Sequence, residues 1–288
     1  MRISTRMPTD AATTAYPAGS RPAVFLRSDL VAAVGHSTIG FMRHNGNEPP
    51  TCLGSGTLIE FGKVFGVLTC AHALEALRTS KEIGFLCFTV RGNVPQSRPF
   101  DPKLLDAVTF GQEPWSVRRP DLAFVRIPAH AEGHFRALST PRNLQRQQEL
   151  LTSEAFSIFA GYAVSGIIDE WTKLGTLRAN RATASYSAFA SLGNLRRHFF
   201  ATDGFDKWIY EPTEMPHTPL PASYGGTSGG GLWRIKVIGE GPDRELKVAL
   251  AGVAVMETRR GKIICHGPYS IYGKLTSAIR AAWPEDCP

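Results

Sequence analysis

The sequence predicts an all-β protein, and two observations support this fold class. First, 28 glycines and 20 prolines are spread along the 288 residues, which fits many turns between short strands. Second, short apolar runs lie between these turn residues along the chain. Hydrophobic residues make up 43% of the sequence, which is enough for a sizeable core in one or two domains.

The first half of the chain contains a predicted hairpin and several further strands. Residues 56–60 and 64–69 form the hairpin, with its turn at Phe61-Gly62-Lys63. Residues 73–78 fit one helical turn, and residues 138–151 predict a crossover to the second half. The other strands expected here are 30–34, 37–41, 83–90, 107–110 and 122–127.

The second half continues with strands and ends in a helix. Glu240-Gly241-Pro242-Asp243 predicts a turn between its last two strands. Apolar residues at 271, 275, 278, 279 and 282 have the spacing of an amphipathic helix over 271–283. The strands expected in this half are 155–162, 175–184, 199–202, 208–210, 232–237 and 245–256.

A cluster of glycines around Ser228 is the most informative stretch for function. Two glycines precede Thr227, and three follow Ser228. Such a cluster indicates backbone conformations that other residues avoid, because glycine otherwise costs conformational entropy. A nucleophilic serine needs such conformations, since the amides beside it must point at a carbonyl oxygen. A flexible Gly-Ser linker is the alternative interpretation.

A histidine and an aspartate precede this serine in the chain. His72 ends the strand-like run Val67-Leu68-Thr69-Cys70-Ala71, and Asp121 opens the apolar run 122–127. The resulting order is His72, Asp121, Ser228. This order is typical of chymotrypsin-like enzymes and differs from the Ser, acid, His order of α/β-hydrolases.

Four motifs in this order resemble those of the chymotrypsin-fold (trypsin-like) serine proteases of the bacterial type. Thr69-Cys70-Ala71-His72 is similar to the family's Thr-Ala-Ala-His, and Asp121-Leu122-Ala123-Phe124 is similar to its Asp-Ile-Ala-Leu. Gly226-Thr227-Ser228-Gly229-Gly230 resembles Gly-Asp-Ser-Gly-Gly, and Gly54-Ser55-Gly56 resembles the Gly-Ser-Gly strand before the histidine. The resemblance covers roughly residues 30–280.

The resemblance implies a double barrel. We expect two six-stranded antiparallel β-barrels with a C-terminal α-helix, which together form a trypsin-like peptidase domain over 29–288. A tail rich in Thr, Ala, Pro and Ser precedes it, and we expect this tail to be disordered. The expected boundaries are 1–28 for the tail, about 29–137 for barrel 1, about 150–270 for barrel 2 and about 271–283 for the helix.

The resemblance also implies a role for each matching residue. His72 would take the hydroxyl proton of Ser228 during attack and return it to the leaving amine, and its ordinary pKa of about 6.5 suits both steps. Asp121 would fix the imidazole tautomer and stabilise the imidazolium. The amides of Gly226 and Ser228 would form the oxyanion hole.

The substrate pocket is expected from the same resemblance. Ala222, six residues before the nucleophile, would lie at the base of the pocket. Val255 and Met256 would line its wall, with Glu257 near the mouth. The absence of a charge at the base favours a medium or large apolar residue before the cleaved bond, although Glu257 could instead favour a basic one.

Two departures from animal relatives bear on control and compartment. Thr227 stands where many of them have an aspartate that pairs with a new N-terminus, so we expect activation through loops or a partner. Ala73 follows His72 where they carry a bonded cysteine. The odd number of cysteines, five, and the lack of an apolar secretory signal favour reduced thiols in the cytoplasm. A Cys52–Cys70 bridge stays open.

Charge and histidine spacing suggest no further ligand. The net charge of +7 could attract nucleic acid, but no nucleic-acid-binding motif accompanies it, so a solvated basic surface is the interpretation we adopt. His130 and His134 have the i, i+4 spacing of a metal pair, yet Gly133 weakens the helix and a third ligand is missing. No metal, no cofactor and, with apolar runs well short of about 18 residues, no membrane span is expected.

The sequence therefore predicts a serine endopeptidase that hydrolyses peptide bonds of a protein or peptide through an acyl-enzyme. A regulatory protein partner would restrain it in the cytoplasm. The first alternative is a catalytically silent, protease-like binding module. The second is a serine esterase of another fold, since residues 226–230 also satisfy G-x-S-x-G, but it would need a histidine after Ser228, where His266 stands.

Overall fold

The computed structural model describes residues 29–45, 48–88, 96–153, 157, 159–174, 184–214, 220–239 and 244–288. The expected tail 1–28, most of the expected strand 175–184 and the expected turn 240–243 lie outside these residues. Among the helices within the described ranges, none has the length and apolar composition needed to cross a membrane.

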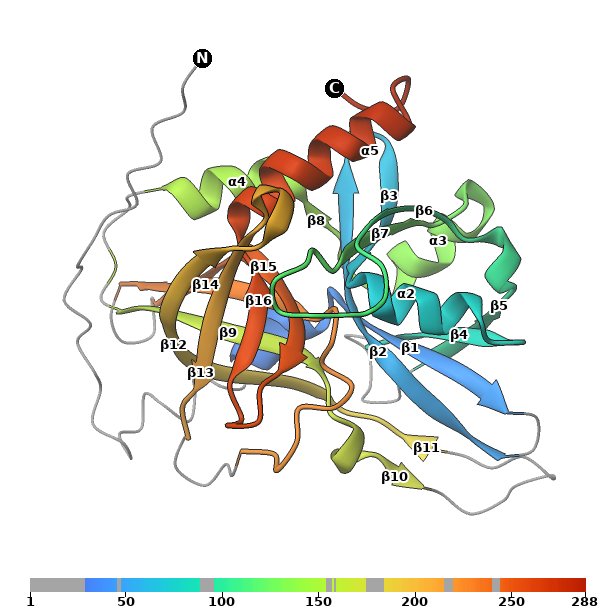
Figure 1. Ribbon diagram of the computed structural model, residues 1–288, viewed down its shortest axis with the longest axis horizontal. Helices are drawn as coiled ribbons and strands as arrows, with labels where there is room; N and C mark the ends of the chain where they lie inside the picture. Colours follow the sequence, from blue (N-terminus) through green and yellow to red (C-terminus); the bar gives the residue numbers. More distant parts are fainter. Residues whose placement is uncertain are drawn as a thin grey trace.

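The first half of the chain forms an eight-stranded sheet, on the right in Figure 1. Its strand order is β5-β4-β1-β2-β3-β7-β6, and β8 pairs with β2 in parallel while the other pairs are antiparallel. The strands are β1 (Thr38–Asn45), β2 (Glu48–Phe61), β3 (Val64–Thr69), β4 (Ile83–Cys87), β5 (Gln96–Phe100), β6 (Asp106–Phe110), β7 (Leu122–Arg126) and β8 (Arg142–Asn143).

Aromatic side chains pack together in the core of this half. Phe85 packs edge-on against Phe41, Phe100 and Phe135, with ring centroids 5.5–5.6 Å apart. Every residue of β3 is buried, because one face meets this core and the other faces the second half of the molecule. Two helices complete this half, α2 (Ala71–Arg78) and α3 (Ala129–Leu138), and a short helix, η1, spans Pro102–Leu104.

The second half forms a closed antiparallel barrel with the order β12-β13-β16-β15-β14-β9. A separate pair of short strands, β10 and β11, lies beside it (Figure 1). The elements are β9 (Phe159–Ile167), η2 (Asp169–Trp171), β10 (Lys173–Leu174), β11 (Ala184–Ser185), β12 (Ala188–Phe200), η3 (Thr202–Gly204), β13 (Asp206–Pro212), β14 (Gly231–Ile238), β15 (Glu245–Glu257) and β16 (Ile263–His266).

The expected fold class is confirmed in its coarse form. The protein is mainly β-strand, with one closed six-stranded barrel, a second sheet and a C-terminal helix. Closure of the first sheet stays a prediction, because the described pairings run from β5 to β6 without joining these two edges. The hairpin at Gly62 is confirmed, and Gly62 adopts a positive φ of 61° there.

Residues 30–34, predicted as a strand, are helical instead, within a helix over residues 29–35. The prediction was wrong because the buried side chains follow the helical period. Leu30 and Val34, four residues apart, are 1% and 0% exposed, whereas the residues between them are more exposed.

Two helices connect the halves. The predicted crossover contains α4 (Leu144–Thr152), which Asn143 caps by accepting the Arg146 amide at 3.0 Å. The C-terminal helix begins as a π-helical turn, η5 (Ser270–Leu275), and continues as α5 (Thr276–Ala282). Figure 1 shows α5 running from the barrel toward the first sheet, where Lys63 N donates to Asp286 O at 2.7 Å.

Candidate active site

The three residues predicted as a catalytic triad come from both halves of the molecule. His72 lies in the first turn of α2, Asp121 directly precedes β7, and Ser228 lies in the loop before β14. Two backbone hydrogen bonds of 2.7 Å join this loop to both halves. Ser55 N, in the first sheet, donates to Ser228 O, and Gly229 N donates to Ala254 O, in the barrel. The Ser228 loop therefore lies at the junction of sheet and barrel.

Glycines at this junction allow the backbones to approach closely. A β-carbon on Gly54 would lie 2.9 Å from Ser228 O and 3.0 Å from the β-carbon of Ala73, so the serine loop and the start of α2 are neighbours. A β-carbon on Gly229, whose φ is +90°, would lie 2.0 Å from Ser55 O. Both positions therefore require glycine.

His72 and Asp121 are joined by two hydrogen bonds. His72 Nδ1 lies 2.7 Å from Asp121 Oδ2, and the backbone N–H of His72 donates to Asp121 Oδ1 at 3.1 Å. Asp121 is 1% exposed, whereas the His72 side chain is 28% exposed. Both carboxylate oxygens are used, so the ring orientation is fixed and Nδ1 carries the proton.

The environment of His72 favours its charged form. Burial on its own lowers the pKa of the imidazole, whereas Cys70 and the hydrogen-bonded carboxylate of Asp121 raise it, and the balance lies above the usual 6.5. Burial raises the pKa of the Cys70 thiol, whereas the neighbouring His72 imidazole lowers it, and burial is the larger effect.

Ser228 is not hydrogen-bonded to His72 in this conformation. Its Oγ donates to Val255 O at 3.0 Å, and the polar atom nearest to His72 Nε2 among the described contacts is Cys70 Sγ at 3.6 Å. The hydroxyl hydrogen of Ser228 must turn away from Val255 O before it can be donated to the imidazole. Loose or absent contacts of this kind are common in enzymes without substrate.

The two amides predicted to form the oxyanion hole have no hydrogen-bond acceptor among the described residues. Thr227 N donates to Tyr224 O at 3.1 Å, and Gly226 has a φ of +86° at the third position of this turn, which is typical of a type II turn. Within the described part of the chain, neither Gly226 N nor Ser228 N donates a hydrogen bond. Both donors are therefore available to an oxygen atom of a ligand.

Ser55 supports this turn, a role that the sequence motif did not reveal. Its Oγ donates to Gly226 O at 2.6 Å and accepts the Ile167 amide at 2.8 Å, while its carbonyl accepts Thr69 Oγ1 at 2.8 Å. One hydroxyl thus ties the turn to β9 of the barrel. The Gly-Ser-Gly motif pointed to the strand, but its partners lie more than a hundred residues away.

A buried network of polar side chains contacts the backbone of Asp121, and the sequence did not predict it. Its backbone N–H donates to His266 Nε2 at 3.1 Å, so His266 Nδ1 carries the proton and faces Ser270 Oγ at 3.2 Å. Ser270 Oγ in turn donates to Asp206 Oδ1 at 2.6 Å. Beside this network, the buried Lys207 donates to Arg119 O at 2.8 Å.

Burial dominates the titration of this supporting network. It lowers the pKa of His266 from 6.5 to about 3, with a further lowering by Lys207. It also lowers the pKa of Lys207 from 10.5 to about 8. His266 is therefore a neutral acceptor at physiological pH.

The residues expected to form the substrate pocket lie on two neighbouring segments, but Glu257 has another partner. Its Oε2 accepts the Tyr224 amide at 2.9 Å and Ser223 Oγ at 3.2 Å. Ala222 is exposed, and its amide donates to Glu170 at 3.0 Å. Val255 is 1% exposed, and Met256 is partly buried. Two carboxylates thus fix the loop before the serine.

All five cysteines are free thiols, so the Cys52–Cys70 bridge that the sequence left open is not formed. Cys52 Sγ instead contacts Gly54 O at 3.5 Å. His130 and His134 do share α3, as their spacing required. Among the described residues, however, the group with three potential metal ligands close together is Cys70, His72 and Asp121.

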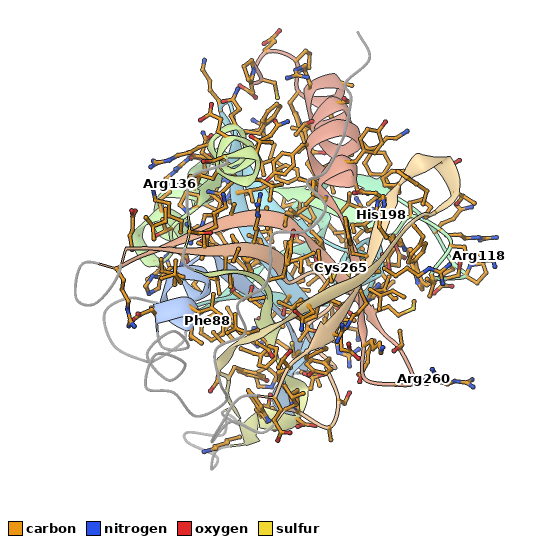
Figure 2. The ribbon with its side chains drawn as sticks, turned by 90° about the vertical axis from the view of Figure 1, so that its left-hand side faces the viewer. Phe88, Arg118, Arg136, His198, Arg260 and Cys265 are labelled. Carbon is orange, nitrogen blue, oxygen red and sulfur yellow. The ribbon has the colours of Figure 1, made fainter. Side chains whose placement is uncertain are left out.

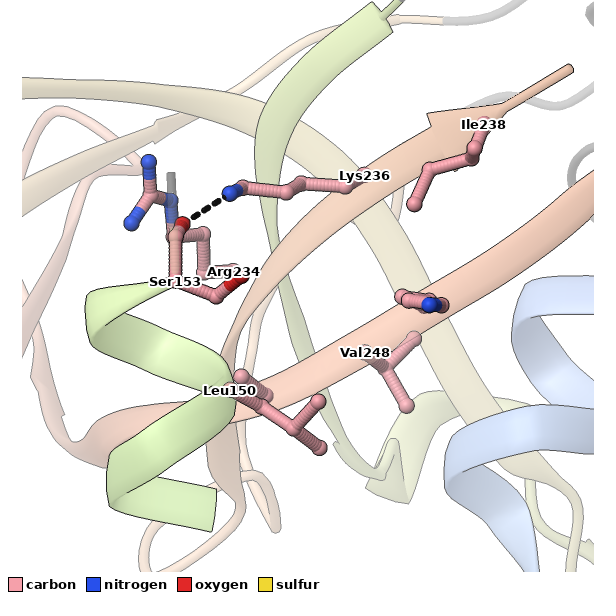
Figure 3. A pocket seen from close by; sticks show the side chains of 8 residues that line it. Leu150, Ser153, Arg234, Lys236, Ile238 and Val248 are labelled. Carbon is pink, nitrogen blue, oxygen red and sulfur yellow. Dashed lines mark hydrogen bonds between the residues drawn. The ribbon is translucent and has the colours of Figure 1, made fainter. Parts of the chain in front are cut away.

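Charged side chains are dispersed over the surface. Figure 2 shows Arg136 on one side of the molecule and Arg118 and Arg260 on the other, with Cys265 in the interior. A small cavity of about 40 Å³ lies at the end of α4 (Figure 3), where Lys236 donates to Ser153 O and Arg234 donates to Leu151 O. These two cations satisfy the carbonyls that end the helix.

Comparisons with known proteins identify no family. No family model matches the chain, and no curated protein matches it. One solved structure, described as "Aromatic interactions drive the coupled folding and binding of the intrinsically disordered Sesbania mosaic virus VPg protein", is similar over 83% of this chain and 90% of that chain. It shares 13% identity with a TM-score of 0.40, and a similarity of this size carries no conclusion.

Proposed function

We propose that the chain is a serine endopeptidase in which Ser228 is the nucleophile, His72 the general base and Asp121 its orienting partner. The observation that carries this proposal is the 2.7 Å contact between His72 Nδ1 and Asp121 Oδ2 beside a serine loop with two free amides. These side chains come from distant parts of the sequence, in the chain order of chymotrypsin-like enzymes.

The reaction would proceed in two halves. Ser228 Oγ attacks the peptide carbonyl and passes its proton to His72 Nε2, while the amides of Gly226 and Ser228 stabilise the oxyanion. One such donor contributes about 3–4 kcal/mol in well-studied proteases. His72 then protonates the leaving amine, and water releases the acyl group by the same route.

Two features indicate that this state is resting. Ser228 Oγ donates to Val255 O, and the raised pKa of His72 favours an imidazolium, which cannot accept a proton. Attack therefore requires rotation of the serine hydroxyl and loss of the imidazolium proton. Binding of a protein substrate or a regulatory protein partner would bring about both changes. The five free thiols fit a reducing compartment such as the cytoplasm.

Labelling with a fluorophosphonate probe tests the proposal. We expect the full chain to be labelled, and both Ser228→Ala and His72→Ala to abolish labelling. Ser277→Ala, at an exposed serine of α5, is the matched control and should be labelled like the unchanged protein. Equal labelling of the unchanged protein and Ser228→Ala would refute the proposed nucleophile.

A protease-like binding module is the second candidate, and the position of Ser228 Oγ on Val255 O favours it. A folded protein that no phosphonate labels, with or without unfolded protein substrates, would support this candidate. The esterase alternative is less well supported. His266, which that alternative would need as its base, is 0% exposed and accepts the Asp121 amide.

A further inference from the structure

Cys70 is an unexpected neighbour of the proposed general base. It stands where the resembled motif has alanine, it is 0% exposed, and its Sγ lies 3.6 Å from His72 Nε2. Nε2 is the atom that would take the serine proton. We propose that Cys70 Sγ and His72 Nε2 together form a binding site for Zn²⁺, and that the bound ion holds the active site in its off state.

The distance between the two atoms fits a shared zinc ion. Zinc binds cysteine sulfur at about 2.3 Å and histidine nitrogen at about 2.0–2.1 Å, usually with tetrahedral geometry. Two such bonds at the tetrahedral angle place the sulfur and the nitrogen about 3.6 Å apart. This is the separation of Cys70 Sγ and His72 Nε2.

Asp121 supplies the supporting contact that zinc-bound histidines usually have. A histidine ligand typically donates its other ring N–H to a carboxylate, which fixes the tautomer and strengthens the ligand. Asp121 Oδ2 occupies this place on His72 Nδ1 at 2.7 Å. Potential ligand atoms of Cys70, His72 and Asp121 all lie within 4.8 Å of one another, but Asp121 is already bonded to the imidazole. We therefore assign it the supporting role.

The imidazole of this site is partly exposed to solvent. The His72 side chain is 28% exposed, and Ser228 Oγ points to Val255 O instead of to Nε2. As zinc binds, the Cys70 thiol proton and any proton on Nε2 pass to solvent, and water fills the remaining positions of the ion. Two protein ligands make a weaker site than the three or four of catalytic and structural zinc centres.

Binding and catalysis would exclude each other. The Nε2 lone pair that coordinates zinc is the one that the proposed mechanism uses to accept the serine proton. This inhibitory consequence rests on the proposed function, whereas the binding itself does not. The sequence predicts no metal site, because the contact between Cys70 and His72 depends on side-chain positions that no motif records.

Cadmium binding to the full chain tests the site directly, since a cadmium thiolate has an ultraviolet charge-transfer band. We expect one Cd²⁺ per chain with this band, displaced by Zn²⁺, and at least about tenfold weaker Zn²⁺ binding for Cys70→Ala and His72→Ala. Cys287→Ala, at a partly exposed thiol, is the matched control and should bind as the unchanged protein does. Equal Zn²⁺ affinity of Cys70→Ala and the unchanged protein would overturn the site.

Phosphonate labelling with and without Zn²⁺ separates this inference from the proposed function. We expect Zn²⁺ to suppress labelling of the unchanged protein, a chelator to restore it, and Zn²⁺ to leave the labelling of Cys70→Ala unaffected. Labelling that Zn²⁺ does not suppress in the unchanged protein would refute the inhibitory site while the proposed function stands. Cadmium binding through Cys70 without any labelling would support the site while the proposed function fails.

Discussion

Replacement of His266 by glutamine should remove a large part of the acid sensitivity of the fold. His266 is fully buried, accepts the Asp121 amide through Nε2 and faces Ser270 through Nδ1. A glutamine can offer an amide oxygen and an NH₂ group in similar places, but it does not titrate. The substitution thus keeps the hydrogen-bonding types and removes the proton binding.

The magnitude follows from the pKa of His266, which burial lowers from 6.5 to about 3. Between these values the unfolded chain binds the proton and the folded chain does not. The part of the free energy of unfolding that depends on a neutral His266 is therefore fully present above pH 6.5 and is lost as the pH falls toward 3. Linkage gives a loss of ~2 kcal/mol at pH 5 and ~3 kcal/mol at pH 4.

Urea unfolding from pH 7 to pH 4 measures this loss. The free energy of unfolding of the unchanged protein should fall by ~3 kcal/mol more than that of His266→Gln. His198→Gln, at an exposed histidine, is the control and should follow the unchanged protein. Parallel curves for the unchanged protein and His266→Gln would refute the reasoning. So would an NMR titration of His266 near its usual pKa, which does not depend on the variant folding well.

Three further predictions concern the site and its support. Gly226→Ala places a β-carbon at a φ of +86°, 2.9 Å from Ile167 O; it should lower phosphonate labelling by about a hundredfold or more, while Gly225→Ala, without a positive φ, should not. Because the pKa of His72 lies above 6.5, the labelling rate should rise with pH beyond neutrality, and a flat profile from pH 6 to pH 9 would contradict the assignment. Burial lowers the pKa of Lys207 from 10.5 to about 8, so between pH 8 and pH 10.5 the unfolded chain binds more protons than the folded chain, and the free energy of unfolding rises with pH by ~3 kcal/mol. Lys207→Met should abolish this rise in urea unfolding, and an equal rise in the variant would contradict the buried position of the lysine charge.

The parts of the fold that sequence could predict are those with local signals. The hairpin at Gly62 has two apolar strands joined by a short turn that contains a glycine, and neighbouring residues in the sequence show both features. Strand β16 was missed because it has four residues and is defined by pairing with β13 and β15, not by its own pattern. The helix at 29–35 was misassigned because its short apolar run mixes valines, which favour strands, with alanines, which favour helices, so local preference does not decide between the two.

Sequence motifs likewise predicted some features of the candidate site and not others. Motifs predicted that His72 and Asp121 would meet, and the structure places them 2.7 Å apart, although their catalytic role stays a prediction. The direction of the Ser228 hydroxyl depends on a rotamer that no motif specifies. His266 could not be assigned to Asp121 from sequence, because a contact between residues 145 positions apart arises only when sheet and barrel pack together.

The return of the C-terminal segment to the first sheet has a consequence for the order of events during synthesis. Trp283 packs on Phe124 at 5.8 Å, and Asp286 pairs with Arg126, a residue made 160 positions earlier. At usual rates of translation, roughly 10–30 s separate the appearance of these two partners on the ribosome. The sheet that carries His72 and Asp121 therefore waits, without its last contacts, until the barrel and its helix are complete. If the proposed function holds, a newly made chain would become active only after Trp283 and Asp286 have been made and have packed on the first sheet.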